Sequence, residues 1–249
     1  MGWYRNWKRK RLLAAGHIDE ALWQRVASEL DFLRGIAQPD LARLRDLALL
    51  FLNEKEMHGA GELELSDEIR LSIALQACLP ILNLGLDVYQ GWVGIIVYPG
   101  EFRVKREEID ADGVLHQYDD ELSGEAWPDG PVILSWEDVK HTSAGYNVVI
   151  HEFAHKIHMT HGEDEDCPAP FPGMDRKPWR ETLERDYRRF CAMVNSGRET
   201  LIDPYASEHP AEFFAVMSEM FFTDSAVLKR DWPDLYRQLS LFYRQDPQA

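Results

Sequence analysis

The chain has 249 residues, of which 45% are hydrophobic and 28% charged, which is ordinary for a soluble globular protein. This length suits one large domain or two small ones. The net charge of −16 disfavours direct binding to nucleic acid, whose phosphates would be repelled. No apolar run approaches the roughly 20 residues that span a bilayer, so we expect no membrane span.

The N-terminal stretch is basic and aromatic and lacks the apolar region of a secretory signal. We expect residues 1–16 to form a solvated or docking arm and residues 17–249 to form a single domain. The three cysteines, Cys78, Cys167 and Cys191, are widely spaced and odd in number. This pattern argues against a disulfide framework and indicates a reducing compartment, so we expect a cytoplasmic protein.

The spacing of apolar residues predicts a series of helices and short strands. Helical spacing runs from Ile18 to about Glu56, and Pro39-Asp40 divides it into two helices. The remaining expected elements, in chain order, are a helix over 66–79, strands over 91–98, near 102–106 and over 132–136, and helices over about 147–159, 179–194 and 211–222. The sequence therefore predicts an α+β fold that is mainly helical with a small sheet.

The most informative motif is His151-Glu152-Phe153-Ala154-His155, an H-E-x-x-H pattern in an apolar predicted helix. Residues four apart lie on one helical face, so both histidines can reach one ion at about 2.0–2.1 Å. Glu152 lies one step round the helix, where it can reach a water molecule beside the ion and act as general base. Buried polar side chains need partners. The motif therefore predicts a zinc site.

A catalytic zinc site needs a third protein ligand, and the residues leave several candidates. His161 stands where metzincins have their third histidine, but His158 occupies the position where that pattern requires Gly. His158 itself lies about 10.5 Å along the helix from the first histidine, so we expect it at the rim of the site or beside a ligand. Asp175, Glu181 and Glu184 lie at a thermolysin-like distance downstream, although the two glutamates fall in a strongly charged helix.

The fourth kind of candidate is Glu212, in the strongly apolar helix predicted over 211–222. A buried carboxylate needs a partner, and a cation suits it. Glu219, seven residues later, is its competitor, or could instead orient a histidine ligand. Tyr205, seven residues before Glu212, could stabilise an oxyanion, although on the residues alone a packing role explains it better.

Three segments of the chain resemble the Mlc titration factor A (MtfA) family of bacterial zinc peptidases. They are HEFAHK at 151–156, LIDPYA at 201–206 and PAEFFA at 210–215. Supporting segments lie at 77–84, 97–99 and 242–247. The resemblance runs from about Leu50 to the C-terminus, and several motifs in the right order make it specific.

The resemblance implies a gluzincin fold related to the catalytic domain of anthrax lethal factor. It implies one Zn²⁺ held by His151, His155 and Glu212, and so favours Glu212 as the third ligand. It also implies that Glu152 is the base and Tyr205 the oxyanion donor. One departure is at His158, where the family usually has Asp; the ligands are intact, but the surroundings of the site differ.

Two functional hypotheses follow from the sequence. The leading one is a cytoplasmic zinc-dependent peptidase. The resemblance implies aminopeptidase-type activity on peptides. It also implies binding of an Mlc-type, glucose-responsive transcription repressor, which would modulate the expression of sugar-uptake genes of the phosphotransferase system. The alternative is a binding protein that titrates such a repressor and uses zinc mainly to hold its fold. An acidic surface suits capture of a basic DNA-binding domain.

Overall fold

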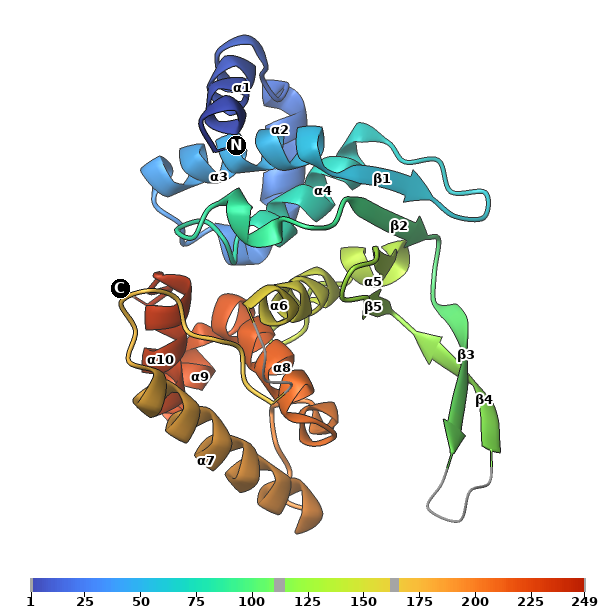
Figure 1. Ribbon diagram of the computed structural model, residues 1–249, viewed down its shortest axis with the longest axis vertical. Helices are drawn as coiled ribbons and strands as arrows, with labels where there is room; N and C mark the ends of the chain where they lie inside the picture. Colours follow the sequence, from blue (N-terminus) through green and yellow to red (C-terminus); the bar gives the residue numbers. More distant parts are fainter. Residues whose placement is uncertain (1, 110–114, 162–165, 249) are drawn as a thin grey trace.

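The computed structural model describes residues 2–109, 115–161 and 166–248, with the backbone alone described for 104–109, 115–121, 160 and 161. Within these residues the chain is mainly helical, with one small sheet and one hairpin (Figure 1). The expected α+β layout is thus confirmed in its proportions. Within the same residues, no helix combines the length and the apolar character needed to cross a membrane.

The elements follow one another in the order shown in Figure 1. The α-helices are α1 (Gly2–Ala15), α2 (Glu20–Glu29), α3 (Gln38–Glu54), α4 (Asp67–Cys78), α5 (Trp136–Lys140), α6 (Val148–His161), α7 (Arg176–Asn195), α8 (Pro210–Thr223), α9 (Ser225–Asp231) and α10 (Pro233–Tyr243). The 3₁₀ helices are η1 (Asp31–Leu33), η2 (Leu86–Tyr89) and η3 (Pro204–Ser207). The strands are β1 (Glu56–Gly59), β2 (Gly94–Tyr98), β3 (Phe102–Ile109), β4 (Leu115–Leu122), β5 (Gly124–Ala126) and β6 (Val132–Ser135).

The N-terminal half packs α2 and α3 against α4. The helix predicted over 66–79 begins at Ser66, whose hydroxyl accepts the Ile69 N–H at 3.3 Å, and ends just before Pro80. From Leu71 to Cys78 nearly every side chain of α4 is buried. A helix that is apolar on most sides belongs in the centre of a fold, and α4 occupies that place between the N-terminal helices and α6.

The sheet has the strand order β1-β2-β6-β5. β1 and β2 are parallel, as are β2 and β6, while β5 runs antiparallel to β6 and forms one edge. Along β2 the buried side chains alternate, with Ile95 and Val97 facing the core. β3 and β4 form a separate antiparallel hairpin that extends away from the rest of the molecule (Figure 1). The sheet thus brings β5 beside α6.

The C-terminal half packs α7, α8, α9 and α10 around an aromatic core. Every residue of α8 from Phe213 to Phe222 is buried. The indole of Trp179 stacks on Phe242, with ring centroids 4.8 Å apart and planes 8° apart, and Phe214 packs edge-on to both. α6 lies directly against α8, so the motif helix is held between the central helix α4 and this aromatic core.

Several elements were absent from the prediction. The basic N-terminal stretch, expected as a solvated or docking arm, contains the helix α1, and Arg5 and Arg9 on one side of this helix pair with Asp87 and Glu54 of the body. β1 and β5 have only four and three residues, too few for a clear pattern. β4, α5, α9 and α10 were also not predicted.

Candidate metal centre

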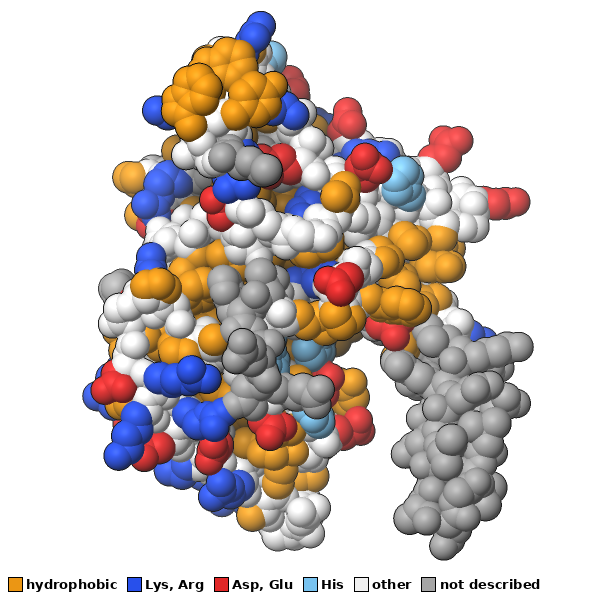
Figure 2. Space-filling view, viewed as in Figure 1, with side chains coloured by type: hydrophobic (Ala, Val, Ile, Leu, Met, Phe, Trp, Pro, Cys, Tyr) orange, Lys and Arg blue, Asp and Glu red, His pale blue; other side chains and the backbone are white. Residues whose placement is uncertain are grey.

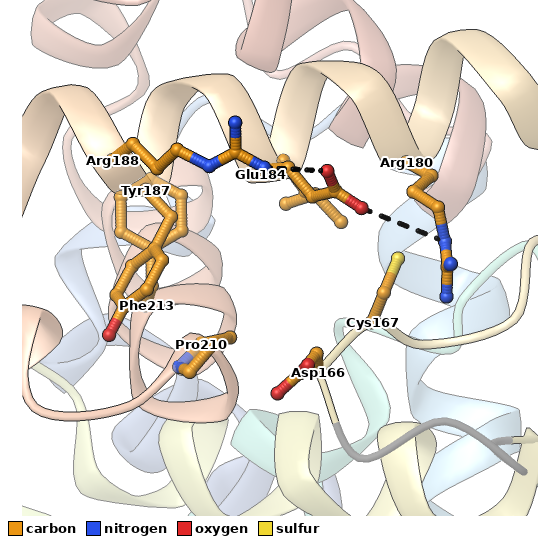
Figure 3. Close-up of a pocket in the computed structure, with 9 residues that line it drawn as sticks. Asp166, Cys167, Arg180, Glu184, Tyr187, Arg188, Pro210 and Phe213 are labelled. Carbon is orange, nitrogen blue, oxygen red and sulfur yellow. Dashed lines mark hydrogen bonds and ion pairs between the residues drawn. The ribbon is translucent and has the colours of Figure 1, made fainter.

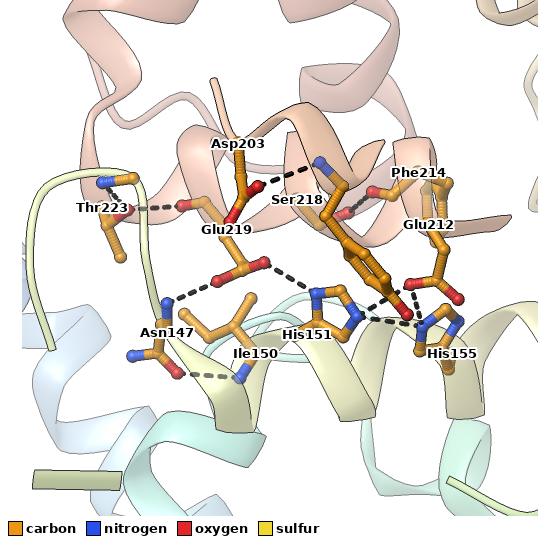
Figure 4. A network of polar contacts seen from close by, with 12 residues as sticks. Asn147, Ile150, His151, His155, Asp203, Glu212, Phe214, Ser218, Glu219 and Thr223 are labelled. Carbon is orange, nitrogen blue, oxygen red and sulfur yellow. Dashed lines mark hydrogen bonds and ion pairs between the residues drawn. The ribbon is translucent and has the colours of Figure 1, made fainter. Parts of the chain in front are cut away.

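Two histidines and one glutamate meet between α6 and α8 (Figure 4). His151 Nε2 lies 3.1 Å from His155 Nε2, and these two nitrogens lie 3.1 and 3.2 Å from the same Glu212 oxygen, Oε2. A tetrahedral zinc site with bonds of about 2.0–2.1 Å places its donor atoms about 3.3 Å apart. The three side chains therefore fit one such ion without rearrangement. Among the residues described, this is the only His/Cys/Asp/Glu group close enough to hold one.

The donor atoms come from α6 and α8, which lie on opposite sides of the cluster. His151 and His155 are one turn apart on α6 and turn their rings toward α8 (Figure 4). Glu212 lies in the first turn of α8 and reaches back toward both rings. Negative charge is favoured in the first turn of a helix, where the free N–H groups point outward. The structure thus places Glu212 and the two motif histidines next to one another.

Glu219 fixes the orientation of His151. It lies two turns after Glu212 on α8, and its Oε1 accepts a hydrogen bond from His151 Nδ1 at 2.7 Å. We place the proton on Nδ1 because a carboxylate oxygen accepts. Nε2 of His151 then presents its lone pair to the centre of the site, as metal binding requires. The sequence left two roles open for Glu219, as the third ligand or as a residue that orients a histidine ligand. The hydrogen bond to His151 Nδ1 matches the second role.

A chain of buried polar side chains continues behind Glu219. Its second oxygen accepts the backbone N–H of Asn147 at 2.5 Å. The Asn147 side chain caps α6 by accepting the Ile150 N–H at 2.8 Å and donates to Gln76 of α4, also at 2.8 Å. The roles of Asn147 and Gln76 were not predicted from the sequence. Their only signal was a polar side chain inside an otherwise apolar run, and the partners lie 71 residues apart.

The charges of the three donors are coupled. Burial opposes ionisation of Glu212, but hydrogen bonds with His151 and His155 outweigh it and hold the Glu212 pKa well below its usual value. Burial likewise works against a charged His151, yet Glu219 and Glu212 raise its pKa well above the usual value. For His155 burial prevails and lowers the pKa. Without an ion, the cluster thus favours a cationic His151, protonated on both ring nitrogens, beside an ionised Glu212, and metal binding would require loss of the Nε2 proton.

Glu152 is buried beside the donors and against strand β5. Its burial raises its pKa to about 8, against an opposing effect of His151. Gly124 of β5 lies so close that a Cβ there would stand 2.5 Å from Glu152 Oε1 and 2.7 Å from its Cγ. Only glycine leaves room for the carboxyl group in this position. The role of Gly124 could not be predicted from the sequence either, because it depends on this contact between segments that are distant in the chain.

The residue after the second histidine anchors α6 on the other side. Lys156 is fully buried, and its Nζ donates to the carbonyl oxygens of Trp127 and, at 2.9 Å, Gly130. The same ammonium group lies 4.6 Å from the ring centroid of Trp92, and Lys55 lies 3.6 Å from it. Burial lowers the pKa of Lys156 to about 8. This contact ties the motif helix to the loop that follows β5.

Tyr205 and His158 flank the cluster differently. Tyr205, in η3, has its ring centroid 6.2 Å from that of His151 and is 43% exposed. His158 is buried one turn beyond His155, with its ring 6.0 Å from Phe214, and burial together with His155 lowers its pKa to about 4. Tyr205 therefore lies at the open side of the site, whereas His158 packs inside the protein rather than at the rim.

The other third-ligand candidates do not join the cluster. Asp175 caps the start of α7 by accepting the Lys177 N–H, and Glu184 pairs with Arg188. Glu181 is exposed on the same helix. The side chain of His161, and the acidic residues 162–165, lie outside what the structure describes.

A separate cavity of about 360 Å³ lies between α7 and the start of α8 (Figure 3). Its lining includes Pro210 and Phe213, which flank Glu212 in sequence, but none of the three donors. Glu184 stands between Arg180 and Arg188 there and pairs with both. The cavity thus shares α8 with the metal centre without being part of it.

Two helix-borne histidines, a glutamate from a neighbouring helix and a buried acid next to the first histidine are the parts of a metallopeptidase centre. Comparison with known proteins agrees. Residues 4–244 match the model of the family described as glucose-regulated metallo-peptidase M90. The chain belongs to this family.

Relatives match over nearly the whole chain. Mlc titration factor A of Pectobacterium atrosepticum is 36% identical over 232 residues, 91% of this chain and 87% of that protein. Mlc titration factor A of Escherichia coli O9:H4 is 34% identical over 243 residues, 94% of this chain and 89% of that protein. An uncharacterised protein of Synechocystis is 33% identical over 232 residues, 90% of this chain and 84% of that protein. The resemblance seen in the motifs is confirmed and extends to the N-terminal residues.

Proposed function

We propose that this metallopeptidase is a zinc-dependent aminopeptidase whose ligands are His151, His155 and Glu212. The observation that carries the proposal is the spacing of the three donor atoms, 3.1 to 3.2 Å, at the distance a tetrahedral ion would impose. Two nitrogen ligands and one carboxylate suit zinc and leave a position open for substrate. Bound there, zinc would polarise the scissile carbonyl and make a neighbouring water acidic enough to attack.

Glu152 is the proposed general base. It follows a ligand directly in sequence, is buried, and has the raised pKa that favours a carboxyl group holding a proton near neutral pH. A divalent cation close by would favour the ionised form. Glu152 would then accept the proton of the attacking water and pass it to the leaving amine.

Tyr205 is the proposed oxyanion donor. Its ring stands beside that of His151 on the exposed side of the cluster. A phenol hydroxyl placed there can donate to the negative oxygen that forms on the scissile carbonyl. A Tyr205→Phe variant would keep the ring and its packing, so we expect it to lower kcat while leaving zinc content unchanged.

The edge strand β5 offers a place for an extended peptide. It contacts α6, and among the strands that the structure describes it pairs with β6 alone. A peptide can add to such an edge through backbone hydrogen bonds, which accept many side-chain sequences. Gly124 in β5 also keeps Glu152 in place, so the same strand would serve both substrate and base.

The preference for a free N-terminus is tested with paired substrates. We expect hydrolysis of amino-acid 4-nitroanilides with a free amine and little hydrolysis of the same compounds after N-acetylation. Equal rates on both would contradict the aminopeptidase proposal but leave the peptidase proposal standing.

The ligand set is tested by elemental analysis of the purified protein. We expect about one zinc per chain in the wild type and a clear loss in Glu212→Ala. The matched control is Glu208→Ala, an exposed carboxylate four residues earlier that lies outside the cluster. Zinc retained in full by Glu212→Ala would overturn the ligand assignment.

We further propose that the protein acts in the cytoplasm and binds an Mlc-type repressor. The support is the name of the two relatives, Mlc titration factor A, together with three free cysteines and an acidic net charge. In the second candidate function, capture of the repressor is the activity and zinc mainly holds the fold. The Glu152→Gln variant separates the two, because it should bind zinc and a repressor normally but lose hydrolysis.

A further inference from the structure

The outward face of α1 presents three aromatic side chains to solvent. Trp3, Tyr4 and Trp7 are 80%, 64% and 46% exposed. The rings of Tyr4 and Trp7 stack with centroids 6.0 Å apart, and the Arg11 guanidinium lies 5.6 Å from the Trp7 ring. Exposed aromatic groups gathered on one helix face indicate a contact surface rather than a solvated one. We call Trp3, Tyr4, Trp7, Lys8, Lys10 and Arg11 the α1 face.

The opposite side of α1 is already occupied. Arg5 pairs with Asp87 at 2.9 Å, and Arg9 pairs with Glu54 and Asp87, both at 2.6 Å. Leu12 and Leu13 pack against the hydrophobic core. The helix is therefore fixed to the body by one side, and the α1 face points away from it.

Basic residues flank the aromatic groups on both sides. At 100° per residue, Lys10 falls beside Trp3 on one side of the aromatic stripe and Lys8 beside Tyr4 on the other. α1 contains five Lys and Arg residues and no acidic residue, within a chain whose net charge is −16. Figure 2 shows these hydrophobic and basic side chains together at one tip of the molecule.

The position of α1 suits approach to a negatively charged plane. It lies at one end of the longest axis of the molecule (Figure 1). Electrostatic repulsion falls off within about 8 Å at physiological ionic strength. A plane that touches the α1 face therefore meets the basic helix, while most of the acidic body remains beyond that range.

We propose that the α1 face docks on a bilayer containing anionic phospholipid, with the helix lying in the plane of the headgroups. Trp and Tyr favour this interface, where the ring meets the acyl boundary and its polar edge meets water. Lys and Arg beside them attract the lipid phosphates. The helix has 14 residues, about 21 Å, which is too short to span the hydrocarbon core. The contact is therefore peripheral and reversible.

The test is co-sedimentation with vesicles, using full-length protein tagged only at its C-terminus. One vesicle preparation is phosphatidylcholine alone, and the other contains equal amounts of phosphatidylcholine and phosphatidylglycerol. We expect the wild type to pellet with the anionic vesicles, less at high salt, and to stay in solution with the neutral ones. Absence of binding to the anionic vesicles would overturn the proposal.

Two variant pairs assign binding to the α1 face. Trp3→Ser with Trp7→Ser removes the aromatic contact. Lys8→Glu with Lys10→Glu removes two cations, which alone should weaken binding about 25-fold, since each basic residue near an anionic surface strengthens it about fivefold. All four side chains are exposed, so both proteins should fold and melt like the wild type.

Matched controls change the same properties elsewhere. Leu201→Ser and Leu241→Ser remove side chains that are 73% and 53% exposed, and Lys177→Glu with Arg198→Glu makes the same change in net charge. The controls should sediment like the wild type. Equal loss in controls and α1 variants would refute a specific role of the face. A concentration-dependent dimer that Trp3→Ser with Trp7→Ser abolishes, without vesicle binding, would instead assign the face to a second copy.

Discussion

The contact between Glu219 and His151 allows a sharp test of how the candidate metal centre is organised. In Glu219→Gln the side chain keeps its shape but has one acceptor and one donor in place of two acceptors. The wild-type carboxylate accepts from His151 Nδ1 and from the Asn147 N–H. Glutamine can satisfy only one of these two donors as an acceptor, so the variant must choose between two arrangements.

In the first arrangement the amide oxygen accepts from Asn147, and the amide nitrogen donates to His151 Nδ1. The imidazole proton then moves to Nε2, where it donates to Glu212, so the Asn147 N–H and both ring nitrogens of His151 keep partners. This arrangement suits the metal-free protein. It cannot bind zinc, because Nε2 no longer has a free lone pair.

In the second arrangement the amide oxygen faces His151 and the amide N–H₂ faces the Asn147 N–H. Zinc can bind, but two donors oppose each other and the buried N–H is unsatisfied, which costs about 1–3 kcal/mol. We therefore expect the zinc Kd to rise about 10- to 100-fold, the usual range for loss of such a partner.

The assay is competition for zinc against a chromophoric chelator, with metal-free protein that has first been shown to be folded by circular dichroism. Glu208→Gln removes one exposed carboxylate near the start of α8 and serves as the control. A zinc Kd for Glu219→Gln within about twofold of the wild type would refute the argument that Glu219 sets the His151 tautomer.

Three further predictions follow from contacts around the motif helix. Gly124→Ala places a methyl group 2.5 Å from Glu152 Oε1, so kcat should fall at least about tenfold with zinc content unchanged; normal kcat would show that the base does not occupy this position. In metal-free protein, burial raises the Glu152 pKa from 4.5 to about 8. Between these two pH values the folded protein holds a proton that the unfolded chain has lost, so the free energy of unfolding falls as the pH rises through that interval. The free energy of unfolding of Glu152→Gln, measured in urea, should therefore exceed that of the wild type at pH 8 but not at pH 4.5. A difference between the two proteins that is the same at both pH values would contradict this. Lys156→Met fills the same space but removes the ammonium donor from the Gly130 carbonyl group and leaves the Trp127 carbonyl group with the Gly130 N–H alone. This should lower the free energy of unfolding by about 1–3 kcal/mol, and an unchanged value would show that water replaces the amine.

Local signals in the sequence were sufficient for most helices. The break at Pro39-Asp40, the helical spacing over 66–79 and the apolar run of α8 each depend on residues close together in the chain, and the structure places helix ends close to them. Sheet pairing was not predictable in this way. β5 is three residues long and is defined by its partner β6 rather than by its own composition.

The candidate site likewise combines features that local sequence signals indicate with features that depend on long-range contacts. His151 and His155 were visible because one helical turn sets their spacing. Glu212 was one of several candidates because it is a carboxylate among phenylalanines, and the family resemblance favoured it over the others. The tautomer-setting role of Glu219, the close approach of Gly124 and the link from Asn147 to Gln76 depend on segments more than 25 residues apart meeting in space. For α1 the sequence left a solvated and a docking arm both open, because only the structure shows that Arg5 and Arg9 on its inner side are paired with the body.

The shortness of the edge strands has a consequence for aggregation. An open sheet edge carries unpaired N–H and C=O groups that can recruit strands from other copies of a chain. Here one edge is β5, with three residues, and the other is β1, with four. Such an edge can hold a short extended segment through a few backbone hydrogen bonds, yet it gives a growing intermolecular sheet little to build on. If β5 holds the peptide substrate as proposed, its shortness would let it do so with little risk that the protein polymerises through this edge.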